Sequence, residues 1–207
     1  MRHAIVSALA ILGALGFGAA RAGDVDPEVH QHAVHLAVGT CGTCHGTTGV
    51  SEQPKYPRLA GQNANYLAAQ LRAFRSQTRG DADAIGFMWG MSANLDDGTI
   101  DALAQYYASQ KPPMGSAGDP ALVAKGRDIY QKGVESVGVP ACAACHGPDA
   151  HGINDFPRLA GQHAQYVMKQ LASFQSNMRN VAVMHGVAQG LKVEEMQAVA
   201  AFLEAQP

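Results

Sequence analysis

The sequence predicts an all-α protein made of two copies of one domain, and three observations lead to this fold class. Residues 56–62, YPRLAGQ, recur as residues 156–162, FPRLAGQ, with one aromatic side chain exchanged for another. Several segments in both halves carry apolar residues at i, i+3 and i+4, which is the spacing of an amphipathic helix. No segment shows the sustained apolar–polar alternation of a half-buried strand.

Three helices are expected in each half. The first should cover residues 27–37 and, in the second half, the stripe of Val123, Gly126, Ile129 and Tyr130. The second should follow each repeated heptapeptide, over residues 63–76 and 163–176. The third is indicated by the matching stripes Ile100, Leu103, Ala104, Tyr107 and Met196, Val199, Ala200, Leu203.

The two halves differ in a few places. Asp96 is a good N-cap for the last helix of the first half, whereas Lys192 at the matching position is a poor one. The first half also carries four extra residues around 80–86, and residues 133–140 extend the second half ahead of its cysteine pair.

The chain divides into four parts by composition. Residues 1–22 are interpreted as a signal peptide, because a short basic start precedes an apolar stretch and Ala20-Arg21-Ala22 fits the small-x-small cleavage pattern. An uncleaved membrane anchor is the less favoured alternative, because the apolar stretch is short. Residues 23–111 form the first domain, the Pro- and Gly-rich residues 112–120 a linker, and residues 121–207 the second domain.

The net charge argues against one class of partner. Removing residues 1–22 takes away Arg2 and Arg21 but no acidic residue, so the formal charge falls from −2 to −4. Nucleic-acid binding is therefore not expected. Each domain is also small for a self-sufficient core, so a large apolar cofactor would complete it.

All four cysteines lie in two C-x-x-C-H motifs, the attachment signature of c-type haem. In such a motif the two thiols bond to the haem vinyl groups and the histidine becomes an axial iron ligand. The sequence therefore predicts two covalently bound haem c groups, attached through Cys41, Cys44, Cys142 and Cys145, with His45 and His146 as iron ligands.

Other uses of the cysteines fit less well. A single zinc site would join pairs that lie 101 positions apart and would not explain the histidine after each pair. Thioredoxin-like chemistry needs a βαβ setting, which is absent from the predicted elements. Two structural disulfides are the remaining alternative in an oxidising compartment.

The repeat also selects a second iron ligand in each half. Of the methionines, only Met88 and Met184 occupy matching positions, in glycine-punctuated segments expected to be loops. Methionine as the partner of histidine raises the haem potential. Met91 is the alternative for the first haem, and His185 is a competitor for the second.

Further repeated residues suggest supporting roles. The carbonyl of Pro57 or Pro157 is expected to accept a hydrogen bond from the second ring nitrogen of the axial histidine. Polar candidates for contacts with the haem propionates are Gln62, Gln162, Tyr66, Tyr166, Arg79 and Arg179. The histidines without a repeat partner are expected at the surface, and only the His30, His32, His35 cluster suggests an adventitious metal site.

Taken together, these motifs resemble the dihaem cytochrome c4 family over essentially all of residues 23–207. The resemblance rests on C-x-x-C-H-G, PRLAGQ, the downstream Tyr and Gln-Leu, the methionine and the final helix, each present twice. It implies two tandem class I cytochrome c domains related by pseudo-twofold symmetry. By position, its iron ligands map onto His45 with Met88 and His146 with Met184.

The resemblance implies a periplasmic protein, free or loosely membrane-attached, that passes electrons from quinol-oxidising complexes towards terminal oxidases. Its partners would be redox proteins. A different interpretation is the dihaem cytochrome subunit of a periplasmic dehydrogenase, such as a sulfide-oxidising flavocytochrome. No catalytic constellation is seen, and matched methionines argue against a dihaem peroxidase, so the chain is not expected to be an enzyme.

Overall fold

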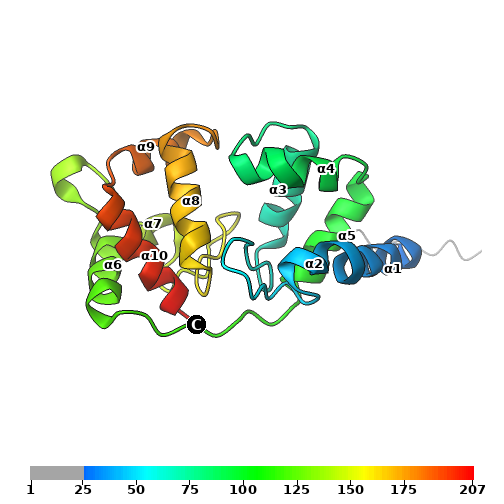
Figure 1. The fold of residues 1–207 in the computed structure, drawn as a ribbon, viewed down its shortest axis with the longest axis horizontal. Helices are drawn as coiled ribbons and strands as arrows, with labels where there is room; N and C mark the ends of the chain where they lie inside the picture. Colours follow the sequence, from blue (N-terminus) through cyan, green and yellow to red (C-terminus); the bar gives the residue numbers. More distant parts are fainter. Residues whose placement is uncertain (1–25) are drawn as a thin grey trace, which may run out of the picture.

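The computed structural model describes residues 26–207, and the signal peptide predicted for residues 1–22 lies outside them. Within that range the chain is helical, with one isolated antiparallel bridge between Val134 and Val139 and no strand. Two helical halves lie side by side, joined by a linker that runs along one edge (Figure 1). No helix between residues 26 and 207 is long and apolar enough to cross a membrane.

The first half is built around three helices that enclose an apolar core. Its core includes Ala33, Leu67, Ile100 and Leu103, which lie on helices α1, α3 and α5. The elements in chain order are α1 (Pro27–Leu36), π-helix η1 (Ala37–Cys41), α2 (Gly42–His45), α3 (Ala64–Arg75), π-helix η2 (Ala84–Met88), α4 (Trp89–Ser92) and α5 (Asp97–Ala108).

The second half repeats this plan. Helix α10 packs so closely on α6 that a Cβ on Gly126 would lie 1.9 Å from the carbonyl oxygen of Ala198. Tyr130 and Met196 are buried in the core beside this contact. The elements are α6 (Pro120–Lys132), 3₁₀-helix η3 (Glu135–Val137), α7 (Ala143–His146), α8 (Ala164–Gln175), α9 (Ala182–Gln189) and α10 (Val193–Ala205).

The helix starts follow their capping residues. The Asp96 carboxylate accepts a 2.6 Å hydrogen bond from the Thr99 amide at the start of α5. The Lys192 side chain makes no such bond at the start of α10, as the sequence predicts. Instead, the Glu195 carboxylate accepts a 2.7 Å hydrogen bond from the Lys192 amide, so this backbone N–H at the helix start has a partner.

Two local expectations were wrong. His163, a histidine without a repeat partner that was expected at the surface, is 3% exposed, and its Nε2 lies 2.9 Å from the Ser51 carbonyl oxygen. The segments that carry Met88 and Met184 are helical, not loops: Met88 ends η2 and Met184 lies in α9. Glycine normally disfavours a helix. Here Trp89 and His185, which occupy matching positions, each bond a backbone carbonyl that lies earlier in the chain. Trp89 donates to the Arg79 carbonyl at 2.8 Å, and His185 Nδ1 lies 2.7 Å from the Phe174 carbonyl.

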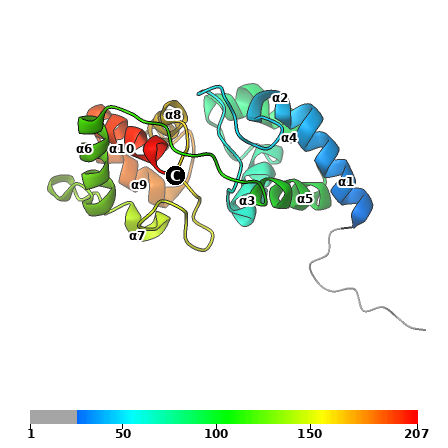
Figure 2. The same ribbon diagram turned by 90° about the horizontal axis from the view of Figure 1, so that it is seen from below.

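The two halves meet through equivalent surfaces, as a pseudo-twofold axis requires. Gln62 of the first half bonds the backbone of Arg158, and Gln162 of the second half bonds the backbone of Arg58. Seen from below, the linker passes across this junction between α5 and α6 (Figure 2). The predicted all-α class, with two repeated helical halves, is therefore confirmed.

Candidate haem-binding site

Each C-x-x-C-H motif forms a single helical turn. Cys44 and His45 lie in α2, directly after the π-helix that ends at Cys41. Both turns stop at a glycine in the left-handed region, Gly46 (φ 78°) and Gly147 (φ 82°). A Cβ on Gly46 would lie 2.4 Å from the Val50 carbonyl oxygen, so the chain can leave the turn here only through glycine.

The four thiols line a cavity and are free rather than joined in disulfides. Burial raises the pKa of Cys41, and it raises the pKa of Cys142 to about 11. Both thiols are therefore neutral at ordinary pH. In residues 26–207 no group of three or more His, Cys, Asp or Glu side chains is placed to hold a metal ion, so the zinc alternative finds no support.

The two motif histidines are buried and held by proline carbonyls. His45 Nδ1 lies 2.9 Å from the Pro57 oxygen, and His146 Nδ1 lies 3.1 Å from the Pro157 oxygen. A carbonyl oxygen only accepts, so each Nδ1 carries the proton and each Nε2 keeps its lone pair. Desolvation lowers the pKa of both rings, although the proline bond opposes this. The prediction that these carbonyls orient the histidines is confirmed.

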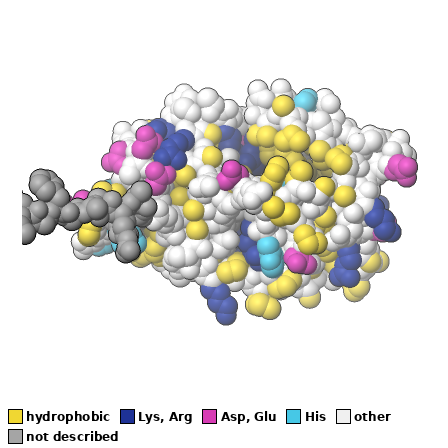
Figure 3. Space-filling model, turned by 180° about the vertical axis from the view of Figure 1, so that it is seen from behind, with side chains coloured by type: hydrophobic (Ala, Val, Ile, Leu, Met, Phe, Trp, Pro, Cys, Tyr) yellow, Lys and Arg dark blue, Asp and Glu magenta, His cyan; other side chains and the backbone are white. Residues whose placement is uncertain are grey.

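A single cavity of about 970 Å³ connects the two motifs. This is the upper end of the usual range for ligand pockets, about 300–1,000 Å³. Its wall includes apolar side chains that are otherwise exposed, such as Phe87 (56% exposed) and Val183 (58%). Seen from behind, apolar side chains gather over the second half of the molecule (Figure 3). Exposed apolar surface of this kind is typical of a binding site.

Met88 and Met184 both line this cavity and are half-buried. Met91 lines it as well but is 60% exposed. The competing ligand His185 is engaged elsewhere, because Nδ1 bonds the Phe174 carbonyl and Nε2 lies 2.9 Å from the Gln189 amide nitrogen. The geometry therefore favours the two matched methionines over the histidine.

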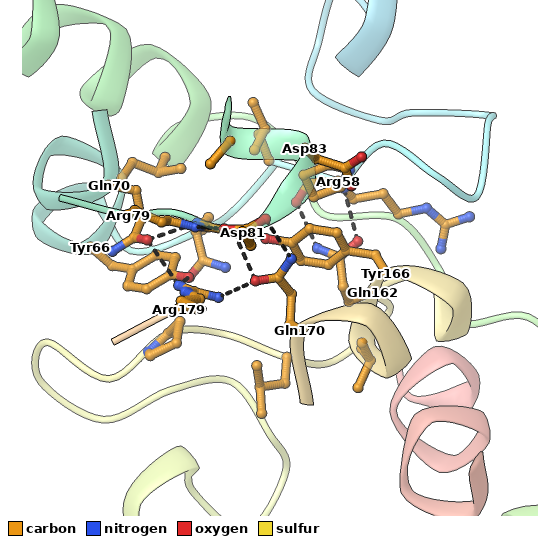
Figure 4. Close-up of a pocket in the computed structure, with 18 of the residues that line it drawn as sticks. Arg58, Tyr66, Gln70, Arg79, Asp81, Asp83, Gln162, Tyr166, Gln170 and Arg179 are labelled. Atoms are coloured by element: carbon orange, nitrogen blue, oxygen red, sulfur yellow. Dashed lines mark hydrogen bonds and ion pairs between the residues drawn. The ribbon is translucent and has the colours of Figure 1, made fainter. Parts of the chain in front are cut away.

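A cluster of polar side chains lies where the two halves face each other across the cavity (Figure 4). Arg79 Nε bonds Asp81 at 2.7 Å, and a second nitrogen of Arg79 bonds Gln170 of the other half at 2.8 Å. Arg179 reciprocates, with 2.7 Å to the Tyr66 hydroxyl and 2.8 Å to Gln70, both of the first half. Arg79 and Arg179 are both more than nine-tenths buried.

The carboxylate of Asp81 belongs to the extra residues of the first half. Burial alone would raise the pKa of Asp81, but the Arg79 guanidinium overrides this and lowers the pKa below its usual value. Asp81 also accepts from the Gln170 amide at 3.4 Å. In the same stretch, Asp83 pairs with Lys169 of α8. The insertion therefore supplies acidic side chains that contact the other half.

Two features of the site were not predicted. Gln62 and Gln162, the candidates for contacts with the haem propionates, line the cavity and are also bonded to the backbone of the opposite half, which the sequence did not indicate. The contacts of Asp81 and Asp83 with α8 were also missed. The only available signal was the length difference between the repeats, which does not say where the added residues point.

The residues present fit two haem groups. Each half brings two neighbouring thiols, one neutral imidazole with a free Nε2 and a thioether to the same largely apolar cavity. This is the donor set of His/Met c-type haem. The arginines and tyrosines of the polar cluster suit the carboxylates that a haem carries.

Comparisons with known proteins agree with this geometry. The cytochrome c family matches residues 34–111 and 123–206. The cytochrome c4 of Azotobacter vinelandii is 37% identical over 215 residues, covering 99% of each chain. The thiosulfate dehydrogenase electron acceptor of Thiomonas intermedia is 37% identical over 209 residues, covering 98% of this chain and 91% of that one.

Solved structures show the same likeness. The cytochrome c4 structure from Acidithiobacillus ferrooxidans superposes with a TM-score of 0.76 at 42% identity, covering 80% of this chain and 98% of that one. The family match covers both halves of the chain. The chain belongs to the cytochrome c family, as a dihaem electron-transfer protein of the cytochrome c4 type with two covalently bound haem c groups.

Proposed function

We propose that this chain is a periplasmic electron carrier that accepts electrons from a quinol-oxidising complex and delivers them towards a terminal oxidase. The observation that carries the proposal is the single cavity that both C-x-x-C-H motifs line. One haem can then receive an electron while the other delivers one. One-electron chemistry is supplied by the haem iron, and the chain holds, orients and shields it.

The proposal includes the iron ligands and the division of the chain. His45 with Met88 would ligate the first iron, and His146 with Met184 the second. The proton on each histidine Nδ1 and the proline carbonyl that accepts it support the histidines, because they leave Nε2 available. Residues 23–111 and 121–207 would form the two domains, separated by residues 112–120.

Substituting the methionines tests the ligands. Oxidised haem with a thioether ligand shows a weak charge-transfer band at the near-infrared edge. Met88→Ala and Met184→Ala are each expected to remove about half of this band and to lower one reduction potential, because a thioether favours ferrous iron. Met91→Ala is the control and should leave the band intact. If Met91→Ala lost part of the band and Met88→Ala kept all of it, Met91 would be the ligand of the first iron.

The electron route is tested with purified partners. Stopped-flow mixing with a quinol-oxidising complex and quinol should reduce both haems, and a terminal oxidase should then reoxidise them. Fractionation should recover the protein from the periplasm or loosely attached to the membrane, with residues 1–22 removed. The route would be contradicted if the quinol-oxidising complex did not reduce the haems or if the terminal oxidase did not reoxidise them.

A second candidate function is electron acceptance from a periplasmic dehydrogenase. It is favoured by the similarity to the thiosulfate dehydrogenase electron acceptor of Thiomonas intermedia. The carrier should be stable and redox-active alone. Purification only as a stoichiometric complex with a catalytic chain, and reduction by that chain rather than by quinol-oxidising enzymes, would favour the dehydrogenase role.

A further inference from the structure

The peptide group that joins residues 157 and 158 is hydrogen-bonded on both sides. Its carbonyl oxygen, from Pro157, accepts from His146 Nδ1 at 3.1 Å. Its amide N–H, from Arg158, donates to the side-chain oxygen of Gln62 at 2.8 Å. Gln62 belongs to the other half, so a residue of the first domain bonds the peptide that holds the histidine of the second.

The reverse contact is present as well. The Pro57 carbonyl accepts from His45 Nδ1 at 2.9 Å, and the Arg58 amide of the same peptide donates to Gln162 at 2.9 Å. Figure 4 shows Gln162 beside Arg58. The arrangement is thus made twice, once in each direction across the domain interface.

Both glutamines are fixed in this position. Gln62 also donates to the Arg158 carbonyl at 2.8 Å, and Gln162 donates to the Arg58 carbonyl at 2.9 Å. Each amide therefore holds both backbone polar groups of its target residue. Gln62 and Gln162 are each 7% exposed, so water competes little for these bonds.

Hydrogen bonds in such a chain strengthen one another. A bond accepted from the amide N–H polarises the peptide and makes its carbonyl oxygen a better acceptor. A better acceptor draws the Nδ1 proton of the histidine more strongly and raises the basicity of Nε2. A more basic axial ligand favours ferric iron and lowers the reduction potential, because hydrogen bonding around the ligand is one of the determinants of that potential.

We propose that Gln62 and Gln162 are positioning residues that each tune the haem of the opposite domain through its axial histidine. Gln62 lowers the potential of the haem at Cys142 and Cys145, and Gln162 lowers that of the haem at Cys41 and Cys44. The redox properties of each haem then depend on the docking of the two domains. This inference rests on the proposed ligation by His45 and His146.

The test is a crossed pattern of reduction potentials in the intact dihaem protein. Gln62→Leu should raise the potential of the second haem more than that of the first, and Gln162→Leu should do the reverse. Each potential is assigned through the paramagnetically shifted haem methyl resonances of that domain. A larger shift in the domain that carries the substitution, equal shifts in both, or no shift would overturn the proposal.

A matched control separates tuning from general loosening of the interface. Asn65 also bonds across the interface, to Asp155 at 2.9 Å, but touches neither Pro–Arg peptide. Asn65→Ala should leave both potentials unchanged. If Asn65→Ala raised the potential of the second haem as much as Gln62→Leu does, loosening of the domain interface alone would explain the effect, and the proposal would be overturned.

A second readout follows the hydrogen bond itself. In the reduced protein, Gln62→Leu should move the His146 Nδ1–H resonance upfield and speed its exchange with solvent, while His45 stays unchanged. An unchanged His146 resonance would overturn the proposal even if the variant is less stable. Methionine ligation is judged separately, by the thioether charge-transfer band, which all glutamine variants should keep.

Discussion

Asp81 makes a buried ion pair with Arg79, with side-chain exposures of 3% and 7%. We predict that Asp81→Asn costs about 3 kcal/mol of unfolding free energy, because it leaves a buried guanidinium without its counter-charge. Denaturant unfolding followed by circular dichroism measures this. Asp101→Asn is the control, because the Arg72–Asp101 pair is half exposed and should contribute less than about 1 kcal/mol.

The same pair predicts a pH dependence. The pKa of Asp81 is lower in the folded protein than in the unfolded chain, whose value is about 3.9. Its stabilisation is therefore complete above that value and is lost as the pH falls towards the folded pKa. Unfolding measured from pH 6 down to about pH 3 should show less acid sensitivity in Asp81→Asn than in the unmodified protein. Parallel curves for the two proteins would contradict this.

Single residues also show how far the sequence could predict the site. The thiols, the motif histidines and the proline carbonyls follow from chemistry that works within one domain, so a repeat identifies them. The bonds of Gln62 and Gln162 to the opposite half were not predicted, because a repeated residue can face its own core or the other copy. In a protein with pseudo-twofold symmetry, both positions repeat equally well.

At the scale of helices, α5 and α10 differ at their N-cap residues. Asp96 caps α5 through Thr99, whereas at α10 only Glu195 bonds back to the Lys192 amide. Asp96→Ala should destabilise the protein by about 1 kcal/mol. Lys192→Ser should stabilise it by about 0.5–1 kcal/mol, because it completes the capping box with Glu195. Thermal unfolding of both variants tests this, and changes of the same sign would contradict it.

The contact between α6 and α10 leaves no room for a side chain at Gly126. Gly126→Ala should destabilise the second domain by at least about 1–3 kcal/mol, because its Cβ would meet the Ala198 carbonyl. Apart from its chain neighbours and the backbone of its own helix, a Cβ on Gly186 of α9 would meet no described atom within 4 Å. Gly186→Ala should therefore stabilise the helix by about 0.5–1 kcal/mol. Equal changes in unfolding free energy for Gly126→Ala and Gly186→Ala would show that the close approach of α6 and α10 does not exclude a side chain at Gly126.

Helix prediction succeeded where the apolar stripe is long and failed where tertiary contacts decide. The stripes that contain Ile100, Leu103 and Met196 predict the last helix of each half from residue spacing alone. The segments around Met88 and Met184 are short and rich in glycine, so their local preference points to loops. Side-chain bonds from Trp89 and His185 to distant carbonyls stabilise helix there, and such bonds leave no periodic pattern in the sequence.

For the whole molecule, the symmetry of the interface is broken by charge. The stretch between Arg79 and Met88 contains Asp81 and Asp83, whereas the matching stretch between Arg179 and Met184 contains no acidic residue. Asp81 neutralises Arg79, while the buried Nε of Arg179 has no hydrogen-bond partner among the described residues. The first domain therefore places two carboxylates beside the shared cavity, Asp81 and Asp83, whereas the second places one, Asp155.

Negative charge near a haem favours the ferric state, so we predict two resolvable reduction potentials, the lower one belonging to the haem at Cys41 and Cys44. Asp81→Asn should raise that potential and narrow the gap. Asp128→Asn, which removes an exposed charge paired with Lys132 on α6, should leave the gap unchanged. Redox titration with the haems resolved by NMR measures both effects. Because electrons settle on the haem of higher potential, a terminal oxidase should then draw them from the two domains at unequal rates. A single titration wave, or a difference between the two potentials that Asp81→Asn does not change, would show that the acidic insertion does not cause that difference.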